Sequence, residues 1–184
     1  MINNIIYEIQ KLNPNSIVAI DGRCGAGKTT LASELQNRLS CNVIHMDDFF
    51  LRPHQRSEER LAEPGGNIDY ERFIEEVLIP LQKNEPFTYK PYSCATQSFG
   101  EPIRIVPGNL TIVEGSYSCH PKFWDFYDLH IFLDVESEEQ IRRIKNRCGE
   151  DGAINFQNIW IPLEEHYFRT YKIKEKSKIK AQST

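Results

Sequence analysis

The sequence predicts an α/β fold in which a mostly parallel central sheet of about five strands lies between two layers of helices. Three observations carry this prediction. Residues 22–29, Gly-Arg-Cys-Gly-Ala-Gly-Lys-Thr, fit the phosphate-binding pattern G-x-x-x-x-G-K-[ST]. Residues 16–21 form a short apolar, β-branched run typical of a buried parallel strand. Beyond the loop, Leu31, Leu35 and Leu39 recur four apart, as on one helix face. This order favours a three-layer α/β/α fold of the P-loop NTPase type with a small lid.

The phosphate loop contains the residue types that this chemistry needs. Glycines allow a tight turn that aims successive backbone N–H groups at phosphate oxygens, and the following helix adds its positive N-terminal end. Lys28 supplies a mobile positive charge for the β- and γ-phosphates, and the Thr29 hydroxyl is the expected ligand of Mg²⁺. A glycine-rich turn without a ligand is the alternative, which the flanking strand and helix disfavour. The predicted ATP contacts are Gly22, Arg23, Cys24, Gly25, Ala26, Gly27, Lys28, Thr29 and Thr30.

Length and composition predict one water-soluble domain spanning residues 1–184. The net charge is −4, which gives no overall basic field and argues against a nucleic-acid partner. No apolar run approaches the roughly 20 residues of a membrane span, and the N-terminus lacks the features of a signal peptide. We therefore expect a cytoplasmic protein without a membrane partner, and leave a homo-oligomer open.

The 5 cysteines are scattered and form no C-x-x-C pair, which favours reduced thiols over disulfides or a zinc site. Cys24 lies in the phosphate loop, where positive charge would favour its thiolate. The simpler interpretation of Cys24 is a small residue that fills the loop. The five histidines likewise show no metal-ligand spacing.

The first half of the chain continues the α/β pattern. Apolar residues at helical spacing predict a helix over 2–12, and 42–46 reads as a second strand that ends at Asp47-Asp48. The polar stretch 52–66 is a loop or lid with little core. Residues 68–81 predict a helix that Asp69 could cap and that Pro80 stops or bends.

The second half supplies two more core strands, 110–114 and 129–135, the first of which ends at Glu114. The aromatic and hydroxyl-rich stretch 87–100 predicts an irregular hairpin whose return strand is 103–106. Residues 121–127 predict a short helix or turn. The substrate-side loops are expected at about 52–68 and 87–106.

A basic helix over 136–148 follows the fourth strand and is broken by Gly149-Glu150-Asp151-Gly152, with the lid at about 142–155. A last helix is expected from about Pro162 to Lys174. The chain from Lys172 contains five lysines and one glutamate, so we predict a frayed, solvated end and a polar tail at 175–184. A nucleic-acid or partner arm is the alternative for this tail.

The phosphate loop, Asp47-Asp48 and Glu114 all follow strand ends, where open parallel sheets bind their ligands. A triphosphate cradle, a metal-supporting carboxylate and a second acidic group suit transfer of a γ-phosphoryl group to a hydroxyl. Arg143 and Arg147, four apart on the basic helix, are the best candidates to neutralise the transferred charge, with Arg142 next. The simpler alternatives are a turn or cap for the aspartates, a strand-end residue for Glu114 and a solvated face for the helix.

These residues resemble the uridine kinase and phosphoribulokinase family over about residues 16–150. The resemblance is carried by 22–30, by Met-Asp-Asp-Phe-Phe at 46–50, by 92–98 and by Val-Glu-Gly at 113–115. Nicotinamide riboside kinases, which belong to that family, have the same D-D-F-F run. The phosphate loop is generic, whereas D-D-F-F at this distance from it is more specific.

The resemblance implies roles for individual residues. It makes Asp47 the catalytic base, places Glu114 at magnesium and the phosphoacceptor, and gives Asp69 the sugar hydroxyls. It makes Tyr92 a substrate-lining residue. Gln97 stands where true uridine kinases have a base-reading histidine, which weakens the case for uridine or cytidine as the acceptor. The arginine-rich helix resembles the family lid.

The sequence thus predicts an ATP- and Mg²⁺-dependent kinase whose partner is a small-molecule phosphoacceptor, foremost a nucleoside. The alternatives are a kinase for nicotinamide riboside or another small alcohol, and a nucleotide-dependent switch without an acceptor. The chain lacks the N-K-x-D run by which GTPases select guanine, which weakens the switch interpretation.

Overall fold

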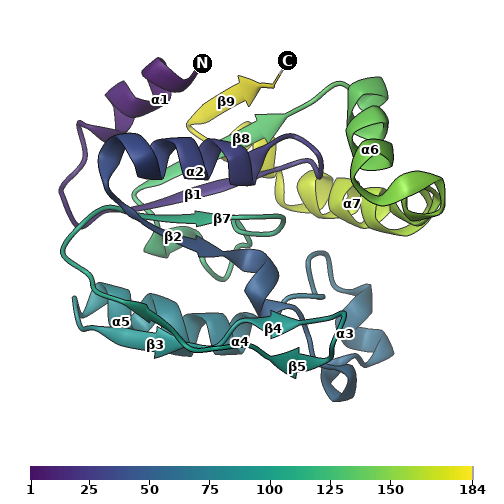
Figure 1. The fold of residues 1–184 in the computed structure, drawn as a ribbon, viewed down its shortest axis with the longest axis horizontal. Coiled ribbons are helices and arrows are strands. Elements are labelled where there is room, and N and C mark those ends of the chain that lie inside the picture. The colour runs from purple at the N-terminus through teal and green to yellow at the C-terminus, as the bar shows by residue number, and fades with distance from the viewer. Residues whose placement is uncertain (184) are drawn as a thin grey trace.

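A five-stranded parallel sheet lies at the centre of the molecule (Figure 1). The computed structural model describes residues 1–183. The strand order is β2-β7-β1-β8-β9, and every neighbouring pair is parallel. The strands are β1 (Ile17–Gly22), β2 (Asn42–His45), β7 (Thr111–Glu114), β8 (Leu129–Asp134) and β9 (Ile179–Gln182). Every residue of β1 and β7 is buried, because helices cover both faces of the sheet. The predicted three-layer α/β/α architecture is confirmed.

One face of the sheet is covered by α1 (Ile2–Ile9) and α2 (Lys28–Leu39), which lie together above β1 in Figure 1. Apolar residues of α1, α2 and the strands form one core, in which Ile5, Ile20 and Leu35 are almost fully buried. The predicted first helix is correct in place but ends at Ile9, three residues early. The helix that follows the phosphate loop is confirmed.

The opposite face is covered by α4 (Tyr70–Phe73), a π-helical turn (Ile74–Leu78) and α5 (Ile79–Gln82), which form one continuous helical run. Pro80 does not stop this run, which continues to Gln82. Because Pro80 has no N–H to donate to the carbonyl four residues earlier, the backbone widens into the π turn just before it. The core on this face is aromatic, and Phe73 packs edge-on against Phe49 and Phe123.

The segments expected on the substrate side form small elements of their own. Residues 52–66 contain a 3₁₀ turn (Pro53–Gln55) and α3 (Glu58–Ala62). The hairpin prediction is confirmed, since β3 (Phe87–Tyr89) pairs antiparallel with β6 (Ile103–Ile105). Its tip is a second ladder of β4 (Tyr92–Ser93) with β5 (Ser98–Phe99). A 3₁₀ turn (Trp124–Phe126) occupies the predicted short helix at 121–127.

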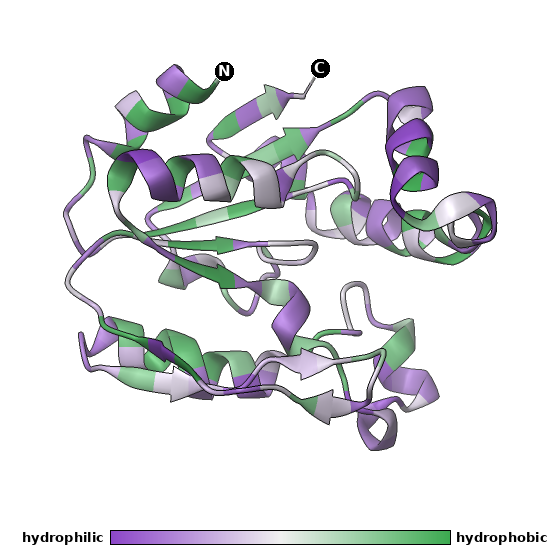
Figure 2. Ribbon diagram, in the orientation of Figure 1, coloured by the Kyte–Doolittle hydropathy of each residue, from purple (hydrophilic) through white to green (hydrophobic). Residues whose placement is uncertain are grey.

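The basic helix is interrupted at Gly149, as predicted, and helix resumes beyond this kink. It runs as α6 (Ser137–Asn155), bends at Gly149, and continues through a π turn (Phe156–Trp160) into α7 (Ile161–Tyr171). Gly149 has φ 75° and ψ −179°, so the chain kinks there, and the predicted break is correct in position. The last helix, expected from about Pro162, is present as α7, but a π turn that the sequence did not predict joins it to the preceding helix. The α6 surface is largely hydrophilic (Figure 2).

The predicted frayed tail is wrong. After α8 (Ile173–Lys176), the chain enters the central sheet as β9, where Ile179 pairs with Ile131 of β8. The Lys174 ammonium contacts the Asp134 carboxylate, which fixes α8 against the end of β8. The lysines suggested solvent because β9 is an edge strand, whose outward-facing residues stay exposed. Within residues 1–183, no helix has both the length and the apolar character to cross a membrane.

Asp21 anchors the end of β1 below the phosphate loop. Its fully buried carboxylate accepts hydrogen bonds from the N–H groups of Gly22, Tyr117 and Cys119 and from the Tyr167 hydroxyl. Burial raises the pKa of Asp21 to about 6, although Lys28 and the hydrogen bonds from Cys119, Tyr167 and Gly22 oppose this shift. The carboxylate joins β1, the segment after β7 and α7 beneath the site.

We expect Asp21→Ala to lower the free energy of unfolding by about 2–4 kcal/mol, because four buried donors lose their acceptor. Urea denaturation would measure this change. Asp128→Ala is the matched control, since the exposed Asp128 carboxylate accepts from one backbone donor, Ile17 N–H. An equal loss in both variants would contradict the anchoring role of Asp21.

Candidate active site

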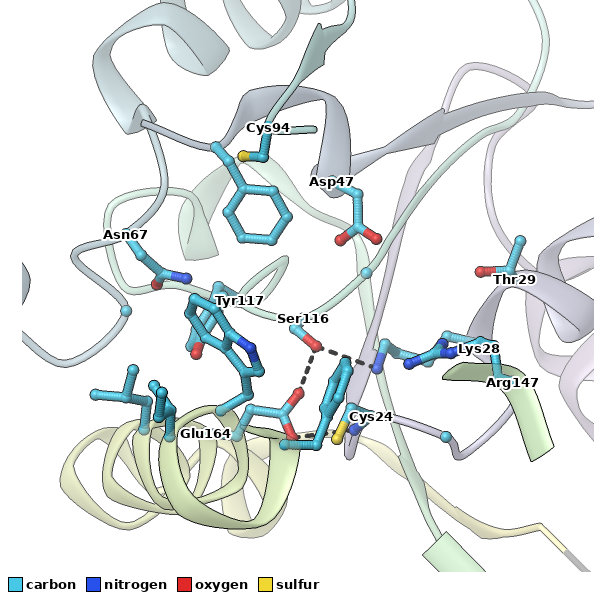
Figure 3. A pocket seen from close by; sticks show the side chains of 18 of the residues that line it. Cys24, Lys28, Thr29, Asp47, Asn67, Cys94, Ser116, Tyr117, Arg147 and Glu164 are labelled. Carbon is cyan, nitrogen blue, oxygen red and sulfur yellow. Dashed lines mark hydrogen bonds between the residues drawn. The ribbon is translucent and has the colours of Figure 1, made fainter. Parts of the chain in front are cut away.

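A cavity of about 1010 Å³ opens at the carboxyl ends of β1, β2 and β7, between the phosphate loop and the lid (Figure 3). The strand ends bring the phosphate loop to one side and Asp47 to another, as expected for an open parallel sheet. Apolar residues from α3, from the π turn before α7 and from α7 line much of the cavity. They include Leu61, Phe156, Ile159, Trp160 and Leu163.

The phosphate loop turns directly into α2, and Gly27 at the turn has φ 89°, a conformation that favours glycine. The Lys28 ammonium donates to the carbonyl oxygens of Gly22 (2.6 Å) and Arg23 (3.0 Å). The Lys28 side chain therefore lies folded along the phosphate loop.

The Cys24 thiol does not behave as expected from its place in the loop. Burial, reinforced by the neighbouring Glu164 carboxylate, raises the pKa of Cys24 to about 12. The thiolate is therefore disfavoured, and the interpretation of Cys24 as a small loop residue stands. All five cysteines are free of disulfides.

Thr29 and Glu114 face each other across the gap between α2 and β7. The Thr29 hydroxyl donates to the Glu114 carboxylate at 3.1 Å, and His45 Nδ1 lies 2.5 Å from the same oxygen. Glu114 is buried, so its carboxylate interacts with these two neighbours more than with water. Among residues 1–183, no cluster of three or more His, Cys, Asp or Glu forms a cage for a metal. A hydroxyl and a carboxylate suit Mg²⁺, which keeps waters and phosphate oxygens as its other ligands.

Asp47 and Asp48 lie in a 3₁₀ turn (Met46–Phe49) that follows β2, and they face different ways. Asp47 lines the cavity, and Figure 3 shows its carboxylate on the same cavity as Lys28 and Ser116. Asp48 instead accepts a hydrogen bond from the Tyr89 hydroxyl at 3.1 Å. Burial raises the pKa of Asp47; Lys28 opposes this shift and Glu114 adds to it. Asp47 thus combines a place on the cavity with a raised proton affinity.

The lid arginines separate into two groups. Arg143 and Arg147 line the cavity, and the Arg143 guanidinium donates to the Gly25 carbonyl oxygen at 3.1 Å. The Arg147 guanidinium lies 5.2 Å from the Phe156 ring centre. Arg142 points elsewhere: its side chain is 63% exposed and pairs with Glu139. The structure therefore brings two of the three predicted arginines to the site.

Four residues assigned to the acceptor by resemblance are absent from the described residues that line the cavity. Glu114 is one of them, although it accepts a hydrogen bond from Thr29, which does line the cavity. Asp69 caps α4 by accepting from Arg72 N–H, and its other oxygen accepts from Gln55. Tyr92 is buried beside Phe99. Gln97 lies exposed at the hairpin tip with φ 51°. The hairpin instead contributes Cys94 to the cavity.

The sequence analysis missed several cavity residues. Ser116 follows the predicted strand end by two positions, which is a local signal that could have been used. Glu164, from α7, has no such signal, because only the tertiary fold brings it to the loop. Others in this group are Phe50, Arg56, Glu63, Asn67 and Tyr117.

The fold and this site define a P-loop protein of the kinase class. A protein from Bacillus stearothermophilus described as a possible uridine kinase has the same fold, with a TM-score of 0.75 at 19% identity, covering 98% of this chain and 96% of that one. Two curated relatives are named uridine kinase. The one from Staphylococcus epidermidis is 26% identical over 88% of this chain and 85% of its own length. The one from Staphylococcus haemolyticus is 28% identical over 85% and 83%.

The family model described as "AAA domain" matches residues 18–165, and the chain belongs to that family. The match begins in β1 and extends beyond Glu164, so it contains the phosphate loop, Asp47, Glu114 and the lid. The predicted resemblance to uridine kinases is confirmed by the curated relatives. Together the findings support an ATP-dependent kinase.

Proposed function

We propose that this chain transfers the γ-phosphoryl group of ATP to a hydroxyl of a small metabolite, foremost a nucleoside. One observation carries the proposal: Lys28 and Asp47, which come from different strand ends, line the same cavity. A phosphate-binding cation and a carboxylate with raised proton affinity then face a shared space large enough for a nucleotide tail and an alcohol.

The reaction needs one proton acceptor and several charge stabilisers. As the acceptor oxygen bonds to the γ-phosphorus, its proton moves to the Asp47 carboxylate and the bond between the γ-phosphorus and the β–γ bridging oxygen breaks, which releases ADP. Lys28, Arg143 and Arg147 neutralise the charge that spreads over the transferred group. The backbone N–H groups of the loop hold the remaining phosphates.

Thr29 and Glu114 would hold Mg²⁺, Thr29 directly and Glu114 as the acidic group beside it. A magnesium ion bound there would supply positive charge that offsets the charge of the phosphates. The hydrogen bond between the Thr29 hydroxyl and Glu114 supports this assignment, because it places two possible oxygen ligands of a metal ion side by side.

The names of the curated relatives support a nucleoside as the acceptor. Tyr92 and Gln97 are not among the described residues that line the cavity. The alternative acceptors are therefore nicotinamide riboside and other small alcohols. The aromatic and apolar part of the lining suits an acceptor that carries a ring, and the polar side chains of Asn67, Glu63 and Arg56 share the same cavity.

A panel of acceptors read by coupled ADP release tests the proposal. The panel contains uridine, cytidine, adenosine, nicotinamide riboside and small sugar and acid alcohols, each with ATP and Mg²⁺. The proposal predicts ADP release that depends on one acceptor class and a phosphorylated product by mass spectrometry. Slow ADP release that no acceptor stimulates, together with a nucleotide-dependent protein partner, would favour the switch alternative.

The pH dependence should report Asp47. Asp47 must be ionised to accept a proton, and burial raises its pKa above the ordinary 3.8, so kcat/KM should fall as pH decreases through this raised value. The measurement is kcat/KM for the acceptor against pH at saturating ATP. An acidic limb at or below the ordinary aspartate value would contradict the role of Asp47.

A further inference from the structure

A buried carboxylate that phosphoryl transfer does not use reaches the phosphate loop from α7. Glu164 is only 3% exposed. One of its oxygens accepts from Cys24 N–H at 3.1 Å, and the other accepts from the Ser116 hydroxyl at 2.6 Å (Figure 3). Ser116 in turn accepts from the Lys28 ammonium at 3.4 Å. A chain of hydrogen bonds therefore joins α7 to the two anion-binding features of the loop, a backbone N–H and the lysine.

The donors that Glu164 occupies are the kind that a phosphate requires. Backbone N–H groups of such a loop bind anions, and a carboxylate and a phosphate both accept charge-assisted hydrogen bonds from them. Glu164 lines the same cavity as Lys28 and Thr29. Because two anions in one desolvated space repel each other, the Glu164 carboxylate and a bound polyphosphate disfavour one another.

We propose that Glu164 is an internal competitor for phosphate, which occupies the loop while the nucleotide is absent and is released when a triphosphate binds. This inference rests on the proposed function, since it concerns regulation of the same site. Glu164 lies on α7, which follows the lid arginines of α6 along the chain, after the kink at Gly149 and one π turn. Release of the carboxylate therefore couples phosphate binding to the position of α7 and the lid.

Nucleotide affinity without an acceptor tests this competition directly. Calorimetry with Mg²⁺ would compare a non-hydrolysable ATP analogue, ADP and adenosine on the wild type and on Glu164→Gln, which keeps the shape but removes the charge. We expect the variant to bind the ATP analogue at least about fivefold more tightly, the lower end of typical coupling between two ligands. The gain should be smaller for ADP and absent for adenosine, because repulsion requires phosphate charge.

Glu138→Gln is the matched control. It changes the net charge by the same amount on an exposed residue in the first turn of α6, and its affinities should equal those of the wild type. Ser116→Ala provides a second variant with the charge intact. It removes one of the two donors that hold Glu164, so it should also tighten binding of the ATP analogue.

The opposite interpretation is that Glu164 only braces the loop. Under it, Glu164→Gln and Ser116→Ala would weaken binding of the ATP analogue, or change all three ligands equally. Either result, with a wild type that binds ATP, overturns the competition and leaves the proposed kinase function standing. Failure of the folded wild type and both variants to bind the ATP analogue would overturn both proposals.

Discussion

Asp47→Asn should lower kcat by about 100- to 10,000-fold, the usual contribution of an aligned general base, while ATP binding stays near the wild-type value. Asparagine keeps the size of the side chain and its place on the cavity but cannot accept the proton of the acceptor hydroxyl. The measurements are steady-state kinetics with the acceptor that the panel identifies and calorimetric binding of an ATP analogue. A loss of ATP affinity equal to the loss of kcat would point to a damaged site instead.

The neighbouring aspartate provides the control. Asp48→Asn makes the same change one residue along, but Asp48 is engaged by the Tyr89 hydroxyl, which an asparagine oxygen can still satisfy. We expect kcat close to that of the wild type. If both variants lose activity to the same extent, the assignment of the base to Asp47 is wrong.

The parts of the fold that local pattern determines were predictable from the sequence. The phosphate loop, its strand and its helix follow from apolar periodicity and glycine chemistry, and the ends of neighbouring parallel strands must meet at one edge. That reasoning alone predicts that Asp47 and Glu114 lie near the loop. The choice between Asp47 and Asp48 came from resemblance, and their geometry is consistent with it because only Asp47 lines the cavity.

Other features depend on contacts that no local pattern encodes. β9 has the composition of a solvated tail, and it becomes a strand because β8 offers an unpaired edge and Ile179 can be buried there. The π turns before Pro80 and Pro162 are a second case, since proline chemistry predicts a lost hydrogen bond but not how the helix absorbs it. Glu164 meets the same limit, because α7 reaches the loop only in the folded chain.

Resemblance was least informative on the acceptor side. Asp69 matched a sugar-binding position, yet here its carboxylate caps α4 and binds Gln55. Local capping needs only a short side chain at a helix start, so the same residue type satisfies a structural demand as readily as a functional one. The acceptor pocket must therefore be argued from the residues that line it.

Arg147→Met should lower kcat by about 100- to 1,000-fold, the cost of removing one preorganised charge from a phosphoryl-transfer site. Methionine preserves much of the stem and its packing against Phe156, so the loss would belong to the guanidinium. ATP affinity should change much less than kcat, because the charge that Arg147 offsets grows mainly in the transition state. Kinetics with the identified acceptor and binding of an ATP analogue give the two numbers.

Arg142→Met is the control, because Arg142 lies on a different face of the lid helix from Arg143 and Arg147. Arg142→Met removes the same charge from the same helix, but the Arg142 side chain is 63% exposed and held by Glu139, on the face that leaves the cavity. Arg143 and Arg147 are one helical turn apart and share a face of the helix. Because successive helical residues are about 100° apart, Arg142 points away from a nucleotide that this face contacts. We therefore expect Arg142→Met to retain wild-type kcat. A large loss in Arg142→Met with little loss in Arg147→Met would mean that the helix turns when the lid closes, and that the arginine facing the phosphates in the active state is a different one.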